Sequence, residues 1–252
     1  KKSLGQNFIT DNNFLQKMNG YIESSKDMII IEIGPGKGAL TKYLEGKNYK
    51  QLHLIEKDNY LAARLKEKYK NSKKIKIINL DALEYNYGDL TNTDGKITIY
   101  GNLPFNISTK LLTLWLSVEV WPSFFDKMIL MFQKEVADRI LANNGNKKYG
   151  RLSVLVQSRC KVKKLLDAPA SIFSPRPKVD GTVIQFEPIN NFNKISFQKL
   201  EKLLEKSFSA RRKKIKNTLS DYHHHLKQLQ IDENLRPENL SVSDYCNLAK
   251  LI

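Results

Sequence analysis

Short apolar segments alternate with amphipathic, charged segments along most of the chain. Met28–Ile33, Gln51–Ile55, Ile75–Leu80 and Lys96–Tyr100 are rich in β-branched residues, as is typical of parallel strands that are covered on both faces of a sheet. Asn59–Lys70, between the second and third of these strands, has the spacing of an amphipathic helix. The alternation predicts an α/β fold in which helices connect parallel strands.

The pattern changes in the second half of the chain. Further strands are expected at Asp126–Phe132, Leu152–Cys160 and Gly181–Glu187, and the last two are expected to form an antiparallel hairpin. Beyond a polar segment that follows the last strand, the periodicity of apolar residues becomes helical. We therefore predict two domains, an α/β domain over residues 1–189 and a small all-helical domain over residues 190–252.

A glycine-rich turn follows the first strand directly, with Gly34, Gly36 and Gly38 ahead of a helical segment. Strand, turn and helix of this kind open a doubly wound fold, and the ligand of such a fold lies at the carboxyl end of the strand. The turn fits the dinucleotide pattern, so an NAD-dependent dehydrogenase is one interpretation, and an unliganded turn is another. However, Pro35 has no N–H for a pyrophosphate, and the carboxylate of Glu32 suits a cation better than a phosphate. S-adenosylmethionine, which carries a sulfonium and an ammonium but no phosphate, meets both conditions.

Acidic residues also stand at the ends of the next two strands. Glu56 lies about 20 residues beyond the glycines, where nucleoside-binding folds hold the ribose hydroxyls. Asp81, followed by Ala82, is placed to accept the amino group of an adenine. A surface salt bridge for Glu56 and a helix cap for Asp81 are the alternatives.

A second turn, Gly101-Asn102-Leu103-Pro104-Phe105-Asn106-Ile107-Ser108, follows the fourth strand. The exocyclic amine of a nucleobase is a weak nucleophile because its lone pair is delocalised into the ring. Two hydrogen-bond acceptors, the side-chain oxygen of Asn102 and the carbonyl of Leu103, can draw the nitrogen toward a tetrahedral form. Pro104 stiffens the turn, and Phe105 offers a face on which a base can stack. An Asn-Pro turn with a core phenylalanine explains this motif, taken alone, equally well.

The formal net charge is +16, and the isoelectric point is about 9.6. Such an excess favours an anionic partner, nucleic acid first and a membrane surface second. In the proline-containing loop 173–180, Phe173 and Lys178 are candidates to meet a base and its phosphates. RNA phosphates are the partner expected for the densest basic run, which is Arg211, Arg212, Lys213 and Lys214. A solvated, lysine-rich surface is the alternative for these charges.

Other features limit the classes of function. No apolar run approaches the roughly 18 residues that cross a bilayer, and no signal peptide is recognisable, so we expect a cytoplasmic protein without a membrane partner. Cys160 and Cys246 are isolated thiols, which suits a reducing compartment. The consecutive residues His223, His224 and His225 cannot share one helix face, so no metal site is expected.

In their order and spacing, the motifs together resemble those of the ribosomal RNA adenine dimethyltransferase family, most closely its bacterial small-subunit branch. The resemblance covers nearly the whole chain and argues strongly against the dehydrogenase. It departs from the family pattern at Phe105, which replaces the frequent tyrosine and keeps the stacking face without the hydroxyl. The matching motifs are Gly5–Ile9, Glu32–Gly38, Glu56, Asp81-Ala82, Asn102–Ser108, Gln133–Val136, Tyr149–Ser153 and Phe173–Val179.

The resemblance implies a Rossmann-like, class I S-adenosylmethionine-dependent methyltransferase domain followed by a helical RNA-binding domain. It implies dimethylation of two adjacent adenines near the 3′ end of small-subunit (16S) rRNA, on the exocyclic amines, as a step in subunit biogenesis. We expect direct transfer without a metal or a covalent enzyme intermediate, a monomeric protein, and a partly assembled small subunit as substrate. The cofactor residues implied are Asn7, Ile9, Gly34, Gly36, Glu56, Asp81, Ala82 and Asn102, and the adenine is expected between Phe105 and Phe173.

Two further interpretations stay open beside the dehydrogenase. A large-subunit (23S) rRNA methyltransferase of the macrolide-resistance type shares the catalytic motifs, although Asn102–Ser108 and the basic helical tail favour the small-subunit branch. An RNA-binding assembly factor, for which catalysis is secondary, would have the same basic surface. The intact Asn102 and Glu56 argue against a loss of activity.

Overall fold

The structure is a computed structural model that describes residues 7–90, 94–119, 121–122, 124–192 and 195–252. The chain divides into two compact units, each described by itself. The first comprises residues 1–112, 124–137 and 163–187, and the second comprises residues 113–123, 138–162 and 188–252. The second unit therefore takes in two stretches that precede residue 189. The assignment of separate functions to residues 1–189 and 190–252 stays a prediction.

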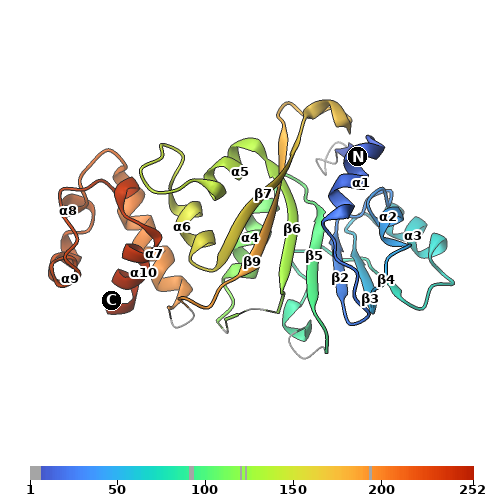
Figure 1. Ribbon diagram of the computed structural model, residues 1–252, viewed down its shortest axis with the longest axis horizontal. Coiled ribbons are helices and arrows are strands. Elements are labelled where there is room, and N and C mark those ends of the chain that lie inside the picture. The colour runs from blue at the N-terminus through green and yellow to red at the C-terminus, as the bar shows by residue number, and fades with distance from the viewer. Residues whose placement is uncertain (1–6, 91–93, 120, 123, 193–194) are drawn as a thin grey trace. The chain divides into compact units, whose positions relative to one another are not determined.

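The first unit contains nearly all of a seven-stranded sheet with the strand order β4-β3-β2-β5-β6-β9-β7 (Figure 1). The strands from β2 to β6 pair in parallel, and β9 pairs with β6 in antiparallel orientation. The bounds are β2 (Ile29–Ile33), β3 (Gln51–Ile55), β4 (Ile75–Ile78), β5 (Ile97–Asn102), β6 (Lys127–Gln133), β7 (Cys160–Ala168) and β9 (Gly181–Pro188). The mixed sheet with connecting helices confirms the predicted α/β class.

The order of the strands determines where a ligand can bind. β3 and β4 lie on one side of β2, whereas β5 and β6 lie on the other. Ile33 at the end of β2 pairs with Ile55 of β3, and Glu32 pairs with Tyr100 of β5. The carboxyl ends of these strands therefore diverge into loops on either side of β2, which makes β2 the topological switch point where doubly wound folds bind ligands.

Helices follow the strands in the first unit, namely α1 (Asn12–Gly20), α2 (Thr41–Leu44) and α3 (Asn59–Lys68), and α4 (Ser108–Leu116) begins there. Asp11 Oδ1 accepts the Phe14 N–H at 2.7 Å, and Asp58 caps α3 in the same way, which satisfies N–H groups at the two helix starts. A short strand, β1 (Phe8–Ile9), pairs in antiparallel orientation with β8 (Phe173–Ser174).

The predicted strand at Leu152–Cys160 is wrong. Residues Arg151–Gln157 form helix α6, and the strand begins only at Cys160. A short apolar run with buried residues on every side fits a helix as well as a strand, so its periodicity could not decide between them. The start of the helix is fixed locally, because Ser153 Oγ accepts the Gly150 N–H at 3.0 Å and donates to the Arg139 carbonyl at 2.5 Å.

Apart from the first residues of β7 and the last residue of β9, the regular structure in the described part of the second unit is helical. Its elements are part of α4 and of α5 (Lys134–Leu141), then α6 (Arg151–Gln157), α7 (Phe197–Ser207), α8 (Ile215–Thr218), α9 (His223–Gln228) and α10 (Val242–Leu251). Leu203 of α7 and Leu248 of α10 are fully buried, and Ser207 bonds the Tyr245 hydroxyl at 2.8 Å. Both cysteines are buried, and burial raises the pKa of each thiol. In the part of the chain that is described, no helix is both long and apolar enough to cross a membrane.

Candidate active site

The glycine turn and Glu56 form one hydrogen-bonded unit at the ends of β2 and β3. The Gly36 N–H donates to Glu56 Oε2 at 2.9 Å, the Gly34 N–H donates to the Ile55 carbonyl at 2.9 Å, and the Gly38 N–H donates to the Pro35 carbonyl at 2.8 Å. Pro35 has no N–H. The turn therefore offers a pyrophosphate none of its glycine donors, in contrast to a dinucleotide-binding turn.

The carboxylate of Glu56 is only 4% exposed, and it lines two adjoining hollows. Burial raises its pKa, against hydrogen bonds from the N–H groups of Asp58 and Gly36, which lower it. Each carboxylate oxygen accepts one N–H and keeps a second acceptor position. Glu56 is therefore placed to accept hydroxyl groups of a ligand, as predicted for a ribose, and that role stays a prediction.

The first hollow contains a second, fully buried carboxyl group. Glu32 is 1% exposed and accepts the Thr41 hydroxyl at 2.7 Å on Oε2. Burial raises the pKa of Glu32 to about 8, so at neutral pH the carboxyl group holds its proton in the protein alone. A cationic ligand in this hollow would favour the ionised form.

The amide of Asn102 is oriented by the N-terminal segment. Asn102 Nδ2 donates to the Asn7 carbonyl at 3.0 Å, and because a carbonyl can only accept, the side-chain oxygen faces the other way. Within the described residues, neither Asn102 Oδ1 nor the Leu103 carbonyl has a hydrogen-bond donor. Both residues line the first hollow together with Phe105. The structure thus brings together the two acceptors predicted from the sequence.

The turn that carries these acceptors is held by its own hydrogen bonds. The Pro104 carbonyl accepts the N–H groups of Ile107 at 3.0 Å and Ser108 at 3.1 Å, and the Ser108 hydroxyl donates to the Phe105 carbonyl at 3.2 Å. The turn leads directly into α4. Asn102 and Leu103 are therefore fixed between β5 on one side and a closed turn on the other.

The N-terminal segment closes one wall of the hollow. Asn7, Phe8 and Ile9 line it, and the Phe8 ring lies so close to Gly36 that a Cβ there would be 2.8 Å from Phe8 Cε1. Gly36 also has a φ of +60°, a conformation that favours glycine. Position 36 therefore requires glycine, both because of its positive φ and because the Phe8 ring leaves no room for a side chain. Gly5 and Gln6 of the same motif lie outside the described residues.

The second hollow is more apolar and has Asp81 at its edge. Burial alone would raise the pKa of Asp81, but hydrogen bonds from Lys57 at 2.6 Å and from the Leu83 N–H at 3.0 Å hold it below its usual value. The bond to Leu83 is the local cap that was the alternative for Asp81. Ala82 also lines this hollow, and within the described residues its N–H has no acceptor.

Sequence reasoning missed several residues of the second hollow. Asn106 and Ile107 line it because the Pro104 turn folds back toward the end of β2, and Lys57 pairs with Asp81 across two neighbouring strands. Asn106 and Ile107 belong to the recognised motif Asn102–Ser108. The sequence did not show, however, that the fold brings them into the same hollow as Asp81. The pairing of Lys57 depends on the tertiary fold and left no local signal.

The residues predicted to bind RNA are placed unequally. Phe105 lines the first hollow, and Lys178 is exposed in the loop after β8. Phe173 is only 4% exposed, belongs to the hydrophobic core and lines neither hollow. The structure therefore does not bring Phe173 to the proposed base, and its stacking role remains without structural support. Ser174, its neighbour, pairs with Phe8 of the pocket wall, so the loop starts beside the first hollow.

The basic run lies in the second unit, and its members differ. All four are exposed, but within the described residues only Arg211 is paired with a carboxylate. It donates to Glu238 at 2.9 Å and to backbone carbonyls of residues 147 and 149. In the described part of the chain, no group of three or more His, Cys, Asp or Glu side chains is arranged to hold a metal.

A doubly wound sheet, acidic residues at successive strand ends and a glycine turn without phosphate donors together define a class I methyltransferase. Solved structures of that class have the same fold. A dimethyladenosine transferase from Plasmodium falciparum matches with a TM-score of 0.82 and 26% identity, over 96% of this chain and 95% of the other. The 23S rRNA methyltransferase ErmE matches in fold, with a TM-score of 0.71 and 19% identity, over 97% of this chain and 98% of its own.

The chain belongs to the ribosomal RNA adenine dimethylase family, whose family model matches residues 1–252. It is 44% identical to ribosomal RNA small subunit methyltransferase A of Pelagibacter ubique (strain HTCC1062), over 99% of this chain and 95% of that relative. It is 39% identical to the protein of the same name from Ehrlichia chaffeensis (strain ATCC CRL-10679 / Arkansas), over 100% of this chain and 96% of that relative. The family resemblance inferred from the motifs is confirmed.

Proposed function

We propose that the protein transfers methyl groups from S-adenosylmethionine to the exocyclic amines of two adjacent adenines near the 3′ end of small-subunit rRNA. The observation that carries this proposal is the pair of oxygens, Asn102 Oδ1 and the Leu103 carbonyl, that line the first hollow without a donor in the described residues. An amine has two N–H groups to donate to two such acceptors.

The polar and apolar groups that line the two hollows fit S-adenosylmethionine. Glu56 has acceptor positions for the ribose hydroxyls, and the apolar second hollow with Asp81 and the Ala82 N–H suits an adenine ring. Glu32 in the first hollow suits the cationic end, and Asn7, Ile9, Gly34 and Gly36 complete the walls. When bound, this cofactor supplies an electrophilic methyl group on a sulfonium. The N–H groups of Gly34, Gly36 and Gly38 are already bonded within the protein, which supports a cofactor without a phosphate.

The chain's own residues would act on the amine. Asn102 Oδ1 and the Leu103 carbonyl accept its hydrogens and localise the lone pair on nitrogen, which makes it a better nucleophile. Phe105 offers a ring face to the flipped base. The bond from Asn102 Nδ2 to the Asn7 carbonyl and the closed Pro104 turn fix both acceptors before the base arrives, so little reorganisation is needed.

The substrate that fits this site best is a partly assembled small subunit in the cytoplasm. We expect the enzyme to act on it as a monomer. One hollow that holds one base offers too little contact to select two adenines from a whole ribosome. The remaining selectivity must come from a wider basic surface that recognises RNA shape and phosphates. The net charge of +16 supports such a surface.

A nucleoside analysis tests the chemistry. The protein, labelled S-adenosylmethionine and unmethylated small subunits are incubated, and the rRNA is digested to nucleosides. We expect dimethylated adenosine as the final product. Under single-turnover conditions at saturating cofactor, Asn102→Ala should lower the rate by roughly 100-fold or more, the usual effect of removing one stabilising group at a reacting centre. A near-normal rate of Asn102→Ala would mean that the amine is activated elsewhere, and methyl groups on another base would refute the assignment.

A further inference from the structure

One loop of the second unit is tied to a segment far away in the sequence. This loop, residues 143–150, is anchored by Tyr149, whose ring is fully buried and packs edge-on against Phe208 with 6.4 Å between centroids. The Gly145 N–H donates to the Glu238 carbonyl at 2.7 Å, and Asn144 Nδ2 donates to the Asn239 carbonyl at 3.3 Å. The loop is therefore held in one place by several backbone and side-chain contacts.

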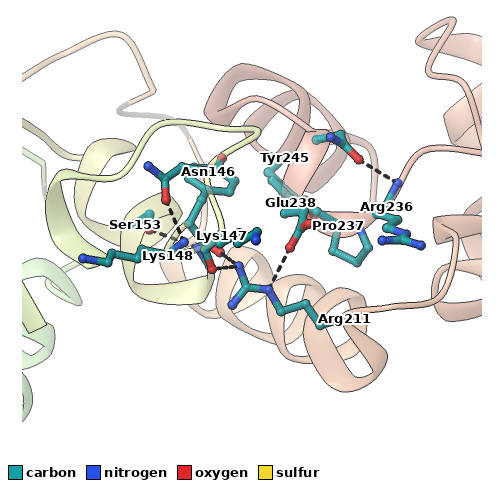
Figure 2. A network of polar contacts seen from close by, with 12 residues as sticks. Asn146, Lys147, Lys148, Ser153, Arg211, Arg236, Pro237, Glu238 and Tyr245 are labelled. Carbon is teal, nitrogen blue, oxygen red and sulfur yellow. Dashed lines mark hydrogen bonds and ion pairs between the residues drawn. The ribbon is translucent and has the colours of Figure 1, made fainter. Parts of the chain in front are cut away.

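Arg211 joins this loop to the basic run, as Figure 2 shows. Its Nε donates to Glu238 Oε2 at 2.9 Å. Nη2 donates to the Tyr149 carbonyl at 2.7 Å and also to the Lys147 carbonyl. The guanidinium is held by these three acceptors although the side chain is 41% exposed, and its charge is already paired with Glu238. Arg211 is thus poorly suited to be the phosphate contact that its sequence context predicted.

The cations around Arg211 are of two kinds. Lys148 pairs with Asp138 at 2.6 Å, and Lys214 donates to the Asn234 side chain at 3.2 Å. Lys147, Arg212 and Lys213 are exposed, and within the described residues their side chains have no carboxylate partner. The Arg211 side chain reaches from the backbone of residue 211 to the Lys147 carbonyl, so Lys147 lies near the basic run. The three cations without a carboxylate partner therefore lie in one region of the second unit.

We propose that loop 143–150 and residues 212–214 form one surface for an RNA phosphate backbone, with Arg211 as the positioning residue that holds the loop. The phosphate contacts are Lys147, Arg212 and Lys213, and Arg211 itself makes none. This inference rests on the proposed function, which supplies RNA as the partner. A fixed backbone beneath flexible lysine tips lowers the ordering cost of binding a strand whose phosphates are regularly spaced. It also gives the Tyr149–Ser153 motif a role outside the catalytic pocket.

The contacts are tested by RNA affinity as a function of salt. The full chain is titrated against a labelled hairpin of the 3′ end of small-subunit rRNA at several KCl concentrations. Lys147→Gln and Arg212→Gln should each flatten the plot of log affinity against log salt by ~0.7–0.9, which is about a five- to eightfold loss at 0.1 M salt. Lys202→Gln, which removes one exposed charge from α7, is the matched control and should have a smaller effect. Equal effects of all three variants would mean that RNA affinity depends on the net charge of the protein and not on this surface, which would contradict the proposal.

The positioning role is tested by two variants that separate geometry from charge. Arg211→Lys keeps the net charge but cannot bridge Glu238 and two carbonyls, and Glu238→Gln makes the protein more positive. Charge alone predicts unchanged and tighter RNA binding, respectively, whereas the proposal predicts a threefold or greater loss in both. In the Arg211→Lys background, Lys147→Gln should cost less than twofold, because the loop is no longer held in place. Thermal unfolding of each variant checks that the fold persists.

Wild-type affinity in both Arg211→Lys and Glu238→Gln, or full additivity with Lys147→Gln, would overturn the proposal. If either bridging variant fails to fold, Lys147→Gln and Arg212→Gln still decide the surface, since their side chains are exposed. Polyglutamate serves as a second probe, and an equal loss of its binding in Lys147→Gln would point to an acidic protein partner and overturn the RNA assignment. Methyl transfer by the wild type is measured in parallel, so failure of this surface is distinguished from failure of the proposed function.

Discussion

The buried carboxyl group of Glu32 should make the stability of the protein depend on pH in a direction that one substitution can reveal. Its folded-state pKa is raised from 4.5 to about 8, with burial as the first cause. Folding therefore favours the protonated form. The stability that this proton contributes is fully present below about pH 4.5 and is lost as the pH rises through 8. Glu32→Gln resembles the protonated carboxyl in shape, and its amide oxygen can still accept the Thr41 hydroxyl.

The size of the effect follows from the two pKa values. At 1.36 kcal/mol for each unit, the Glu32 group should lower the free energy of unfolding by about 4 kcal/mol between pH 5 and pH 8.5. Urea unfolding of both proteins, without cofactor, measures this difference. The variant should have a stability within about 1 kcal/mol of the wild type at pH 5, and it should be the more stable protein at pH 8.5. The raised pKa of Glu56 acts in the same direction in both proteins and cancels. Parallel pH curves would refute the reasoning and mean that water or a nearby cation reaches Glu32.

Two further substitutions examine the cofactor pocket. Glu56→Ala should weaken S-adenosylmethionine binding by about 1–3 kcal/mol, the usual loss for charge-assisted hydrogen bonds, in calorimetry of a folded variant, while the exposed Glu84→Ala should leave affinity unchanged. Gly36→Ala should cost about 1–2 kcal/mol of stability for a side chain at φ +60° and should also weaken cofactor binding, because the new Cβ displaces Phe8. Gly46→Ala, where a Cβ meets nothing within 4 Å, is its control, and equal effects of the two glycine substitutions would contradict the close approach to Phe8.

The parts of the site that were predictable are those encoded by neighbouring residues. The end of β2 and the glycine turn are one continuous motif, so the strand, the turn and the ligand position could be read together. Asn102 and Leu103 are adjacent, so their two acceptors also followed from the local sequence. The bond from Gly36 to Glu56 and the bond from Asn102 to Asn7 join segments that lie far apart in the sequence, and nothing local marks them.

The wrong strand prediction and two site predictions that lack structural support have a common physical cause. Leu152–Cys160 was expected to be a strand because the segment is apolar. When a segment is buried on all sides, its apolar residues show no periodicity that distinguishes a helix from a strand. Phe173 and Arg211 were expected to face RNA because they stand in a proline-containing loop and a basic run. Their side chains instead fill a core and bridge a loop. The residue type gives the chemistry that is available, whereas the tertiary contacts decide where it is used.

The central claim is that the two acceptors at the end of β5 serve adenines of a partly assembled small subunit. The most direct test gives purified protein and labelled S-adenosylmethionine equal amounts of unmethylated small subunits, naked small-subunit rRNA and large subunits, and counts methyl groups on each RNA. The account predicts up to four methyl groups per small subunit, two on each adenine, with little on naked rRNA and none on large subunits. Equal methylation of naked rRNA would contradict the assembled substrate, and a preference for large subunits would contradict the small-subunit assignment.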